Sequence, residues 1–269
     1  MIGRIAVGLV VGVLSYVYVA LRPPSPKICG SPGGPPVTSL RVRLGDGRHL
    51  AYKERGLPKE QAKHKIIVVH AFGDSKGFKL PISEELLKEL EMYLVAFDRA
   101  GYGESDPNPK RSVKSDAFDI QELADKLQLG PKFYVIGISI GAYAIYGCLK
   151  YFPHSHSDLE ILEQLDGPQN EEQEKVEQQG THESLHRDLM VGFGRWEFGP
   201  TDISNPFPNS KGYVHMWQGY EDKICHFELN RYIAERLQWI QYHEVAEAGH
   251  LLIYKAAHCE AIFRALVSS

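Results

Sequence analysis

A serine between two glycines is the first candidate for chemistry in this sequence. Residues 137–141 read Gly-Ile-Ser-Ile-Gly, which fits the pattern G-x-S-x-G. Composition alone produces this pattern in roughly one chain in ten of this length, so its setting decides its value. It lies between a predicted strand at 133–139 and a predicted helix at 142–152. A serine at such a turn exposes its hydroxyl beyond the sheet, which predicts Ser139 as a nucleophile. The alternative is a tight turn that needs small residues only for packing.

A nucleophilic serine needs a base, and the base needs an acid to orient it. In enzymes with this pattern, the acid and then a histidine follow the serine along the chain. Asp222 follows a predicted strand at 213–219, and His250 follows a predicted strand at 239–246. Both residues therefore fall at carboxyl ends of strands, where open α/β sheets carry their sites. Glu221 is the alternative acid.

Other histidines are weaker candidates for the base. Among the 12 histidines of the chain, His243 lies inside a predicted strand and His258 inside a predicted helix. An interpretation without chemistry also exists, in which Asp222 is a surface-loop acid and His250 caps a helix. The chain order and the placement at strand ends favour the catalytic interpretation.

Acyl transfer also needs two backbone N–H groups that bind the developing oxyanion. One is expected from Ile140, the residue after the serine. The other is expected from the loop after a predicted strand at 65–70, which reads His-Ala-Phe-Gly at 70–73. Phe72 is the predicted donor of this loop. We expect neither a metal nor a cofactor at this site.

The rest of the chain alternates strands with helices, which predicts an α/β fold with a mostly parallel sheet covered by helices on both faces. Further strands are predicted at 37–44, 49–56 and 93–98, and further helices at 83–91, around 120–127, at 226–237 and at 250–267. Gly-Asp-Gly at 45–47 is a β-hairpin signal between the first two strands. Between 152 and 213 no window resembles a buried strand, and weak exposed helices are predicted around 158–165 and 171–189.

Composition excludes several classes of protein. The 269 residues are 43% hydrophobic and 24% charged, which is ordinary for a chain with a buried core. The formal net charge is −4, without a basic stripe, so we expect no nucleic-acid partner. The four cysteines are far apart and form no CxxC or CxxH, which argues against a disulfide framework and a zinc site.

The N-terminus is predicted to be a separate piece. Residues 5–21 are an uncharged apolar run between two arginines, and as a helix they would span ~25 Å. We therefore predict that residues 1–22 form a single-pass membrane anchor. The alternative is a signal peptide cleaved after Ala20, which would give a secreted protein, but Tyr18 is too bulky for position −3 of the cleavage site.

A linker and a single domain are predicted after the anchor. Residues 23–36 hold six prolines and three glycines, a composition typical of a stiff linker. The folded domain is predicted at 37–269. The chain has no N-x-Ser/Thr acceptor and no disulfide framework, so this domain is predicted to face the cytosol.

Together these motifs resemble those of the α/β-hydrolases. The resemblance runs from about residue 37 to the C-terminus and includes the 70–73 loop, Asp-Arg-Ala-Gly-Tyr-Gly-Glu-Ser at 98–105, the 137–141 elbow, Gly-Tyr-Glu-Asp at 219–222 and Ala-Gly-His at 248–250. The anchor and the proline-rich linker resemble a group of plant membrane-anchored α/β-hydrolases of mostly unassigned substrate. Epoxide hydrolases and haloalkane dehalogenases of the family use aspartate at the elbow, so a serine there implies acyl chemistry.

Two features depart from the pattern of this family. Ala71 stands where the family usually has glycine, and a positive φ there would strain the loop. After the elbow helix the family has a sixth strand and then a helical cap, whereas the stretch at 153–210 begins with an acidic, Gln-rich segment, so we expect the strand to be absent and the cap to be reduced. A missing strand would shift the strands of Asp222 and His250 by about 5 Å. That expectation implies a broken site, or an alternatively spliced or misassembled chain.

Two functions follow from these expectations. In the first, the resemblance implies a serine hydrolase that cleaves a carboxylic ester or thioester through an acyl-enzyme. Its substrate would be a lipophilic small molecule delivered from the membrane. In the second, the domain is a catalytically silent ligand-binding or scaffold module on the same fold. The complete set of Ser139, Asp222 and His250 favours the hydrolase, whereas a missing strand favours the silent module.

Overall fold

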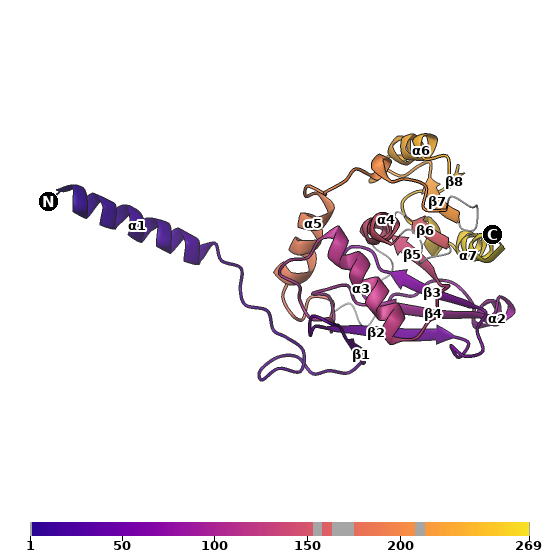
Figure 1. Ribbon diagram of the computed structural model, residues 1–269, viewed down its shortest axis with the longest axis horizontal. Coiled ribbons are helices and arrows are strands. Elements are labelled where there is room, and N and C mark those ends of the chain that lie inside the picture. Colours follow the sequence, from indigo (N-terminus) through magenta and orange to yellow (C-terminus); the bar gives the residue numbers. More distant parts are fainter. Residues whose placement is uncertain (1, 153–157, 163–174, 208–212, 269) are drawn as a thin grey trace.

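A mixed sheet forms the centre of the folded body (Figure 1). The computed structural model describes residues 2–152, 158–162, 175–207 and 213–268. The strands are β1 (Leu40–Arg43), β2 (His49–Gly56), β3 (His64–Val69), β4 (Met92–Phe97), β5 (Tyr134–Ile138), β6 (Asp158–Leu162), β7 (Tyr213–Gly219) and β8 (Ile240–Val245). Their order across the sheet is β1-β2-β4-β3-β5-β6-β7-β8. β2 runs antiparallel to both β1 and β4, and every neighbouring pair from β4 to β8 is parallel.

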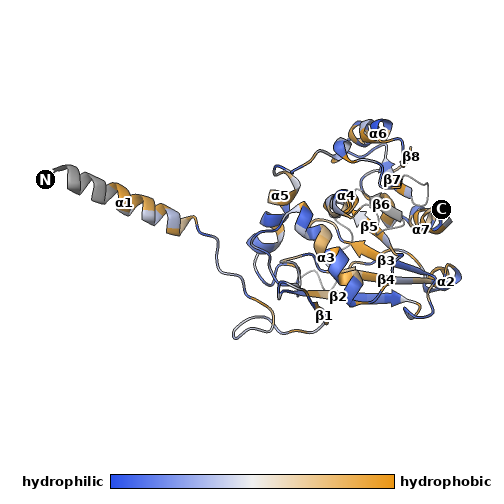
Figure 2. Cartoon of the chain, viewed as in Figure 1, coloured by the Kyte–Doolittle hydropathy of each residue, from blue (hydrophilic) through white to orange (hydrophobic). Residues whose placement is uncertain are grey.

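Helices cover both faces of this sheet. The α-helices of the described chain are α1 (Ile2–Ala20), α2 (Glu84–Glu89), α3 (Val113–Lys126), α4 (Ala142–Tyr151), α5 (Arg187–Gly192), α6 (Phe227–Arg236) and α7 (Ala256–Ser268), of which α2 to α7 belong to the folded body. α3, α4 and α6 pack on one face, and α2 and α7 pack on the other. In Figure 2 the hydrophobic residues concentrate along the central strands, while the outer helix surfaces are hydrophilic. The predicted α/β fold with a mostly parallel sheet is therefore confirmed.

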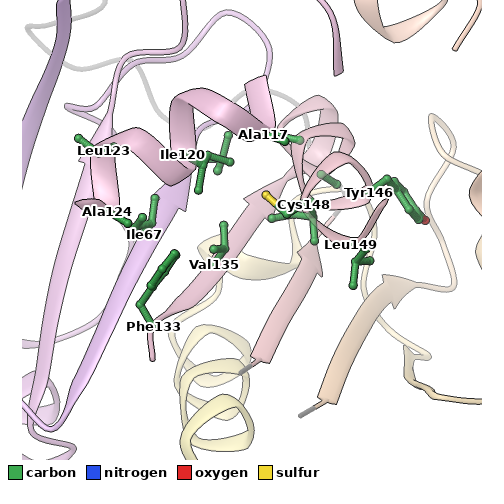
Figure 3. Close-up of a cluster of buried hydrophobic side chains, with 14 of the residues drawn as sticks. Ile67, Ala117, Ile120, Leu123, Ala124, Phe133, Val135, Tyr146, Cys148 and Leu149 are labelled. Atoms are coloured by element: carbon green, nitrogen blue, oxygen red, sulfur yellow. The ribbon is translucent and has the colours of Figure 1, made fainter. Parts of the chain in front are cut away.

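The start and the apolar stripe of α3 show how the sequence forms these layers. Ser112 and Ser115 form a reciprocal capping box that satisfies free backbone N–H groups at the start of the helix. The apolar residues Ala117, Ile120, Leu123 and Ala124 then recur at the spacing of one helix face. In Figure 3 this face and that of α4 point toward Ile67 of β3 and Val135 of β5. This layer of side chains fixes the two strands that lead to the predicted site.

The expectation of a missing sixth strand is wrong. β6 (Asp158–Leu162) lies between β5 and β7 and is parallel to both. Its sequence, Asp-Leu-Glu-Ile-Leu, lacks the apolar run that a strand inside a parallel sheet usually has, so the pattern predicted a weak helix at 158–165. Pairing with two neighbours outweighs that local preference. The strands that carry Asp222 and His250 therefore keep their regular places in the sheet.

Two predicted helices are shorter than expected. Of the helix predicted at 171–189, residues 171–174 lie outside the described residues, and Gly180 has a φ of +124° that interrupts the remainder. A short π-helical turn (His182–His186) and α5 follow it. The last helix is predicted to begin at 250, but α7 begins at Ala256. Lys255, just before it, has an extended backbone that cannot be part of a helix. Of the predicted cap at 153–210, the structure describes 158–162 and 175–207.

The predicted membrane anchor at 1–22 is not supported. α1 (Ile2–Ala20) lies apart from the sheet in Figure 1. In the part of the chain that the structure describes, no helix combines the length and the apolar character that a membrane crossing requires. The cytosol-facing location and the domain boundaries stay predictions.

Removing the side chain of Ile120 tests the layer in Figure 3. Ile120 is fully buried, so Ile120→Ala should lower the free energy of unfolding by ~2–5 kcal/mol, measured by urea titration with circular dichroism. Phe118→Ala is the control, because Phe118 lies in the same helix but is 40% exposed. It should cost less than half as much. Equal losses for both variants would contradict the assignment of this face to the core.

Candidate active site

Ser139 lies at the sharp turn between β5 and α4. β5 ends at Ile138, a 3₁₀ turn spans Ser139–Gly141, and α4 begins at the next residue. Ser139 has a φ of +51°, a left-handed conformation that costs an L-residue roughly 1–2 kcal/mol. Strain of this kind is typical of functional turns. The conformation aims the hydroxyl beyond the end of the sheet, as the G-x-S-x-G pattern predicts.

The two glycines around this serine leave room for backbone and side chains that touch the turn. A Cβ on Gly137 would lie 2.7 Å from Cγ1 of Ile145 in α4. A Cβ on Gly141 would lie 2.6 Å from the Val69 carbonyl oxygen and 2.7 Å from the His70 carbonyl oxygen. The turn therefore packs directly against the end of β3. Only glycine fits at either position without displacing a neighbour.

The structure brings Ser139, His250 and Asp222 together in a buried line. The Oγ of Ser139 lies 3.4 Å from Nε2 of His250. The Nδ1–H of His250 donates to Oδ2 of Asp222 over 2.6 Å. Asp222 follows β7 and His250 follows β8, and all three side chains are buried. This hydrogen bond leaves Nε2 of His250 free to accept the proton of the serine hydroxyl.

Asp222 is held as a carboxylate. Its Oδ1 accepts the backbone N–H groups of Ile224 and Cys225 over 2.8 and 2.9 Å. Burial alone would raise the pKa of Asp222, but the hydrogen bonds from His250 and from these two amides outweigh burial and lower the pKa below its ordinary value. A carboxylate in this state can orient an imidazole and stabilise an imidazolium.

Two buried amide side chains at this site were not predicted from the sequence. Nε2 of Gln218 donates to Oδ2 of Asp222 over 3.1 Å, and Nδ2 of Asn230 donates to Oε1 of Gln218 over 2.6 Å. Gln218, held by Asn230, therefore binds one carboxylate oxygen of Asp222, while the loop amides bind the other. The available signal was Gln218 itself, a glutamine near the end of a buried strand just before the predicted acid.

The predicted oxyanion donors lie on the two segments that meet at the elbow. Ile140 directly follows Ser139, and Phe72 lies in the loop after β3, against which Gly141 packs. Ala71 is not among the residues with positive φ, so the strain expected from alanine at this place does not arise. The roles of the Phe72 and Ile140 amides stay predictions.

The alternative acid and bases lie in other contacts. Within the described residues, Asp222 rather than Glu221 contacts His250. The ring of His243 stacks on Trp217 at 4.1 Å, and Nδ1 of His258 lies 3.3 Å from the Leu252 carbonyl oxygen. Neither histidine belongs to the line that contains Ser139. In the described part of the chain, no group of three or more His, Cys, Asp or Glu side chains could hold a metal ion, and the four cysteines form no disulfide.

The short helix α5 covers the elbow. A Cβ on Gly192 of α5 would lie 2.7 Å from Cε2 of Tyr143 and 3.0 Å from Cδ1 of Ile140. The backbone of this helix therefore rests on the two residues that flank the start of α4. Part of the predicted cap thus lies directly beside the candidate nucleophile.

Comparisons by sequence find no relative. No protein-family model matches the chain, and no curated protein matches it.

Comparisons by structure find many similar proteins. An esterase from Exiguobacterium antarcticum is 16% identical with a TM-score of 0.64, and 86% of this chain covers 100% of the esterase. The enol-lactonase from Burkholderia xenovorans is 12% identical with a TM-score of 0.68, at 86% and 100% coverage. An α/β-hydrolase fold protein from Chitinophaga pinensis is 16% identical with a TM-score of 0.62, at 86% and 97% coverage. At such low identity the likeness establishes the fold alone.

A methyl group on Gly141 tests the packing of the elbow against β3. Gly141→Ala should lower the free energy of unfolding by ~1–3 kcal/mol, because its Cβ would collide with two carbonyl oxygens. Gly249→Ala is the matched control, since a Cβ there would meet only the Glu221 carbonyl oxygen at 3.8 Å. Urea titration should find little change in that variant. A Gly141→Ala protein as stable as the parent would contradict the close packing.

Proposed function

Because the chain has the α/β-hydrolase fold, we propose that it is a serine hydrolase that cleaves a carboxylic ester or thioester through an acyl-enzyme. The observation that carries this proposal is the continuous contact from Ser139 through His250 to Asp222. The serine–histidine distance of 3.4 Å is typical of a site without substrate, where catalytic hydrogen bonds are often long and shorten on binding.

In the proposed reaction, Oγ of Ser139 attacks the carbonyl carbon while Nε2 of His250 accepts the hydroxyl proton. The carbonyl oxygen becomes an oxyanion, which accepts hydrogen bonds from the Phe72 and Ile140 amides. The ionised Asp222 stabilises the imidazolium that forms.

Collapse of the tetrahedral intermediate breaks the bond to the leaving group. His250 gives its proton to the departing alcohol or thiol, and an acyl group stays on Ser139. Water then attacks the acyl carbon, with His250 again as the base, and the acid and free serine are released. This sequence balances without a metal or a cofactor.

A lipophilic substrate fits the surface of α5 beside the elbow. Three large apolar side chains of this region are exposed, Leu189 at 41%, Met190 at 64% and Phe193 at 80%. Gly192 of the same helix contacts Ile140 of the elbow, and exposed apolar side chains near a site favour substrates with apolar groups. The proposed substrate is therefore a lipophilic small ester or lactone, a class supported by the esterase and enol-lactonase among the similar structures. The silent-module alternative depended on a missing strand, which the sheet contains.

Covalent labelling tests the nucleophile. A fluorophosphonate probe should label the full-length chain, and labelling should be lost in Ser139→Ala and in His250→Ala, because the probe reacts only with an activated serine. His258→Ala is the control and should label as the parent does, since His258 contacts the Leu252 carbonyl instead. Gel fluorescence and mass spectrometry of the labelled peptide give the result. Labelling that persists in Ser139→Ala would refute the proposal.

The role of the acid is tested by a substitution that preserves its shape. Asp222→Asn should lower kcat for a p-nitrophenyl ester by ~10²–10⁴-fold, because the amide no longer selects the imidazole tautomer or stabilises its charge. KM should change little, since the carboxylate does not touch the substrate. Glu221→Gln is the neighbouring control, and its kcat should equal that of the parent. Equal effects in the two variants would assign no special role to Asp222.

A further inference from the structure

A buried ion pair joins α5, in the predicted cap, to the loop that follows β4. Asp188 of α5 is 1% exposed, and Arg99, two residues after β4, is 2% exposed. Both Nη atoms of Arg99 donate to the Asp188 carboxylate, with Nη2 at 2.6 Å from Oδ2. Removing two charges from water is costly, and such a pair often adds nothing to stability. The ion pair therefore suggests a role other than stabilising the fold.

Asp188 has further partners that keep it charged. It accepts a hydrogen bond from the Tyr102 hydroxyl over 2.7 Å, and Nη2 of Arg111 lies 3.0 Å from its Oδ1. Burial alone would raise the pKa of Asp188, but the two guanidinium groups outweigh burial and lower the pKa below its ordinary value. The carboxylate therefore holds Arg99 in a single orientation.

Arg99 also donates to the loop after β3. Nη2 of Arg99 donates to the Ala71 carbonyl oxygen over 2.9 Å. His70 binds the same oxygen: its Nε2 accepts the Arg99 backbone N–H over 3.0 Å, so its Nδ1 carries the proton and donates to Ala71 over 2.8 Å. Two donors thus fix the direction of one carbonyl group.

This carbonyl belongs to the same peptide unit as the Phe72 N–H. A peptide unit is planar and, in the trans form, its C=O and N–H point in opposite directions. The described chain has no cis peptide bond. Fixing the Ala71 oxygen therefore fixes the direction of the Phe72 N–H. A charged donor on the oxygen also polarises the unit and strengthens the N–H as a donor.

We propose that Asp188, acting through Arg99, is a positioning residue that aims the Phe72 N–H at the oxyanion. The inference rests on the proposed function, because only an acyl-transfer site uses that donor. Asp188 does not touch the substrate; it acts through the Ala71–Phe72 peptide. The cap helix α5 therefore supports the catalytic machinery as well as covering it.

Two conservative variants test the role, with one matched control. Asp188→Asn keeps the shape but weakens the hold on Arg99, and Arg99→Lys keeps the charge but loses the planar fork. The control is Asp119→Asn. Asp119 is also buried and pairs with Arg48 over 2.6 Å, but this pair joins α3 to the turn before β2 and makes no contact with the loop at 70–73.

Kinetics distinguish positioning from loss of structure. Asp188→Asn and Arg99→Lys should lower kcat for a p-nitrophenyl ester by ~10–100-fold with KM nearly unchanged. The inhibition constant of a trifluoromethyl ketone, which forms a tetrahedral adduct with the serine, should rise by the same factor. Asp119→Asn should change neither quantity, whatever its melting temperature. An unchanged kcat in Asp188→Asn, or equal losses in all three variants, would overturn the inference.

The amide signal of Phe72 separates failure of this inference from failure of the proposed function. In protein labelled with ¹⁵N-phenylalanine, the Phe72 cross-peak is assigned by its absence in Phe72→Leu. It should move in Asp188→Asn and Arg99→Lys but not in Asp119→Asn. If the parent hydrolyses the ester and the cross-peak stays in place, the inference fails alone. If the cross-peak moves but the parent neither labels nor hydrolyses, the proposed function fails, and the oxyanion role of Phe72 fails with it.

Discussion

The left-handed backbone of Ser139 persists because the surrounding packing leaves it no other conformation. Gly137 lies against α4, and Gly141 lies against the last carbonyl groups of β3 and its loop. β3 and β5 are parallel neighbours within a buried core, so the backbone before and after Ser139 cannot move away from these contacts. The same contact that holds the strained serine also brings the loop at 70–73 beside it. One constraint therefore places both the candidate nucleophile and the loop that is predicted to donate to its oxyanion.

The topology of the sheet explains why the contacts between Ser139, His250 and Asp222 could be predicted from the sequence, whereas β6 could not. Ser139 and Asp222 follow strands with a clear apolar signal, His250 follows a strand rich in β-branched and aromatic residues, and the carboxyl ends of parallel strands meet at one edge of a sheet. These three residues meet because of the order and direction of the strands they follow, and both can be predicted from the sequence pattern. β6 has acidic residues at two of its five positions, and it is a strand because it pairs with β5 and β7 rather than because of its own sequence pattern. Such pairing is not encoded in the segment itself.

The polar network around the site could not be predicted for a different reason. Arg99 and Asp188 are separated by 89 positions along the chain, and no spacing rule relates them. Gln218 and Asn230 are only 12 positions apart, but one is in a strand and the other in a helix, so their contact depends on how α6 packs on the sheet. Motif patterns identify residues that react. Residues that orient them are identified only when their partners and burial are known.

α5 links these observations, because a helix of six residues has little stability of its own. Its contacts with the body include the buried carboxylate of Asp188 and the close approach of Gly192 to Ile140 and Tyr143. Both contacts reach the predicted oxyanion donors, one through the Ala71 carbonyl and the other at the residue after the serine. The exposed side chains of Met190 and Phe193 take part in neither of these two contacts. If the proposed function holds, Met190 and Phe193 can therefore be substituted without disturbing the contacts that support the predicted oxyanion donors.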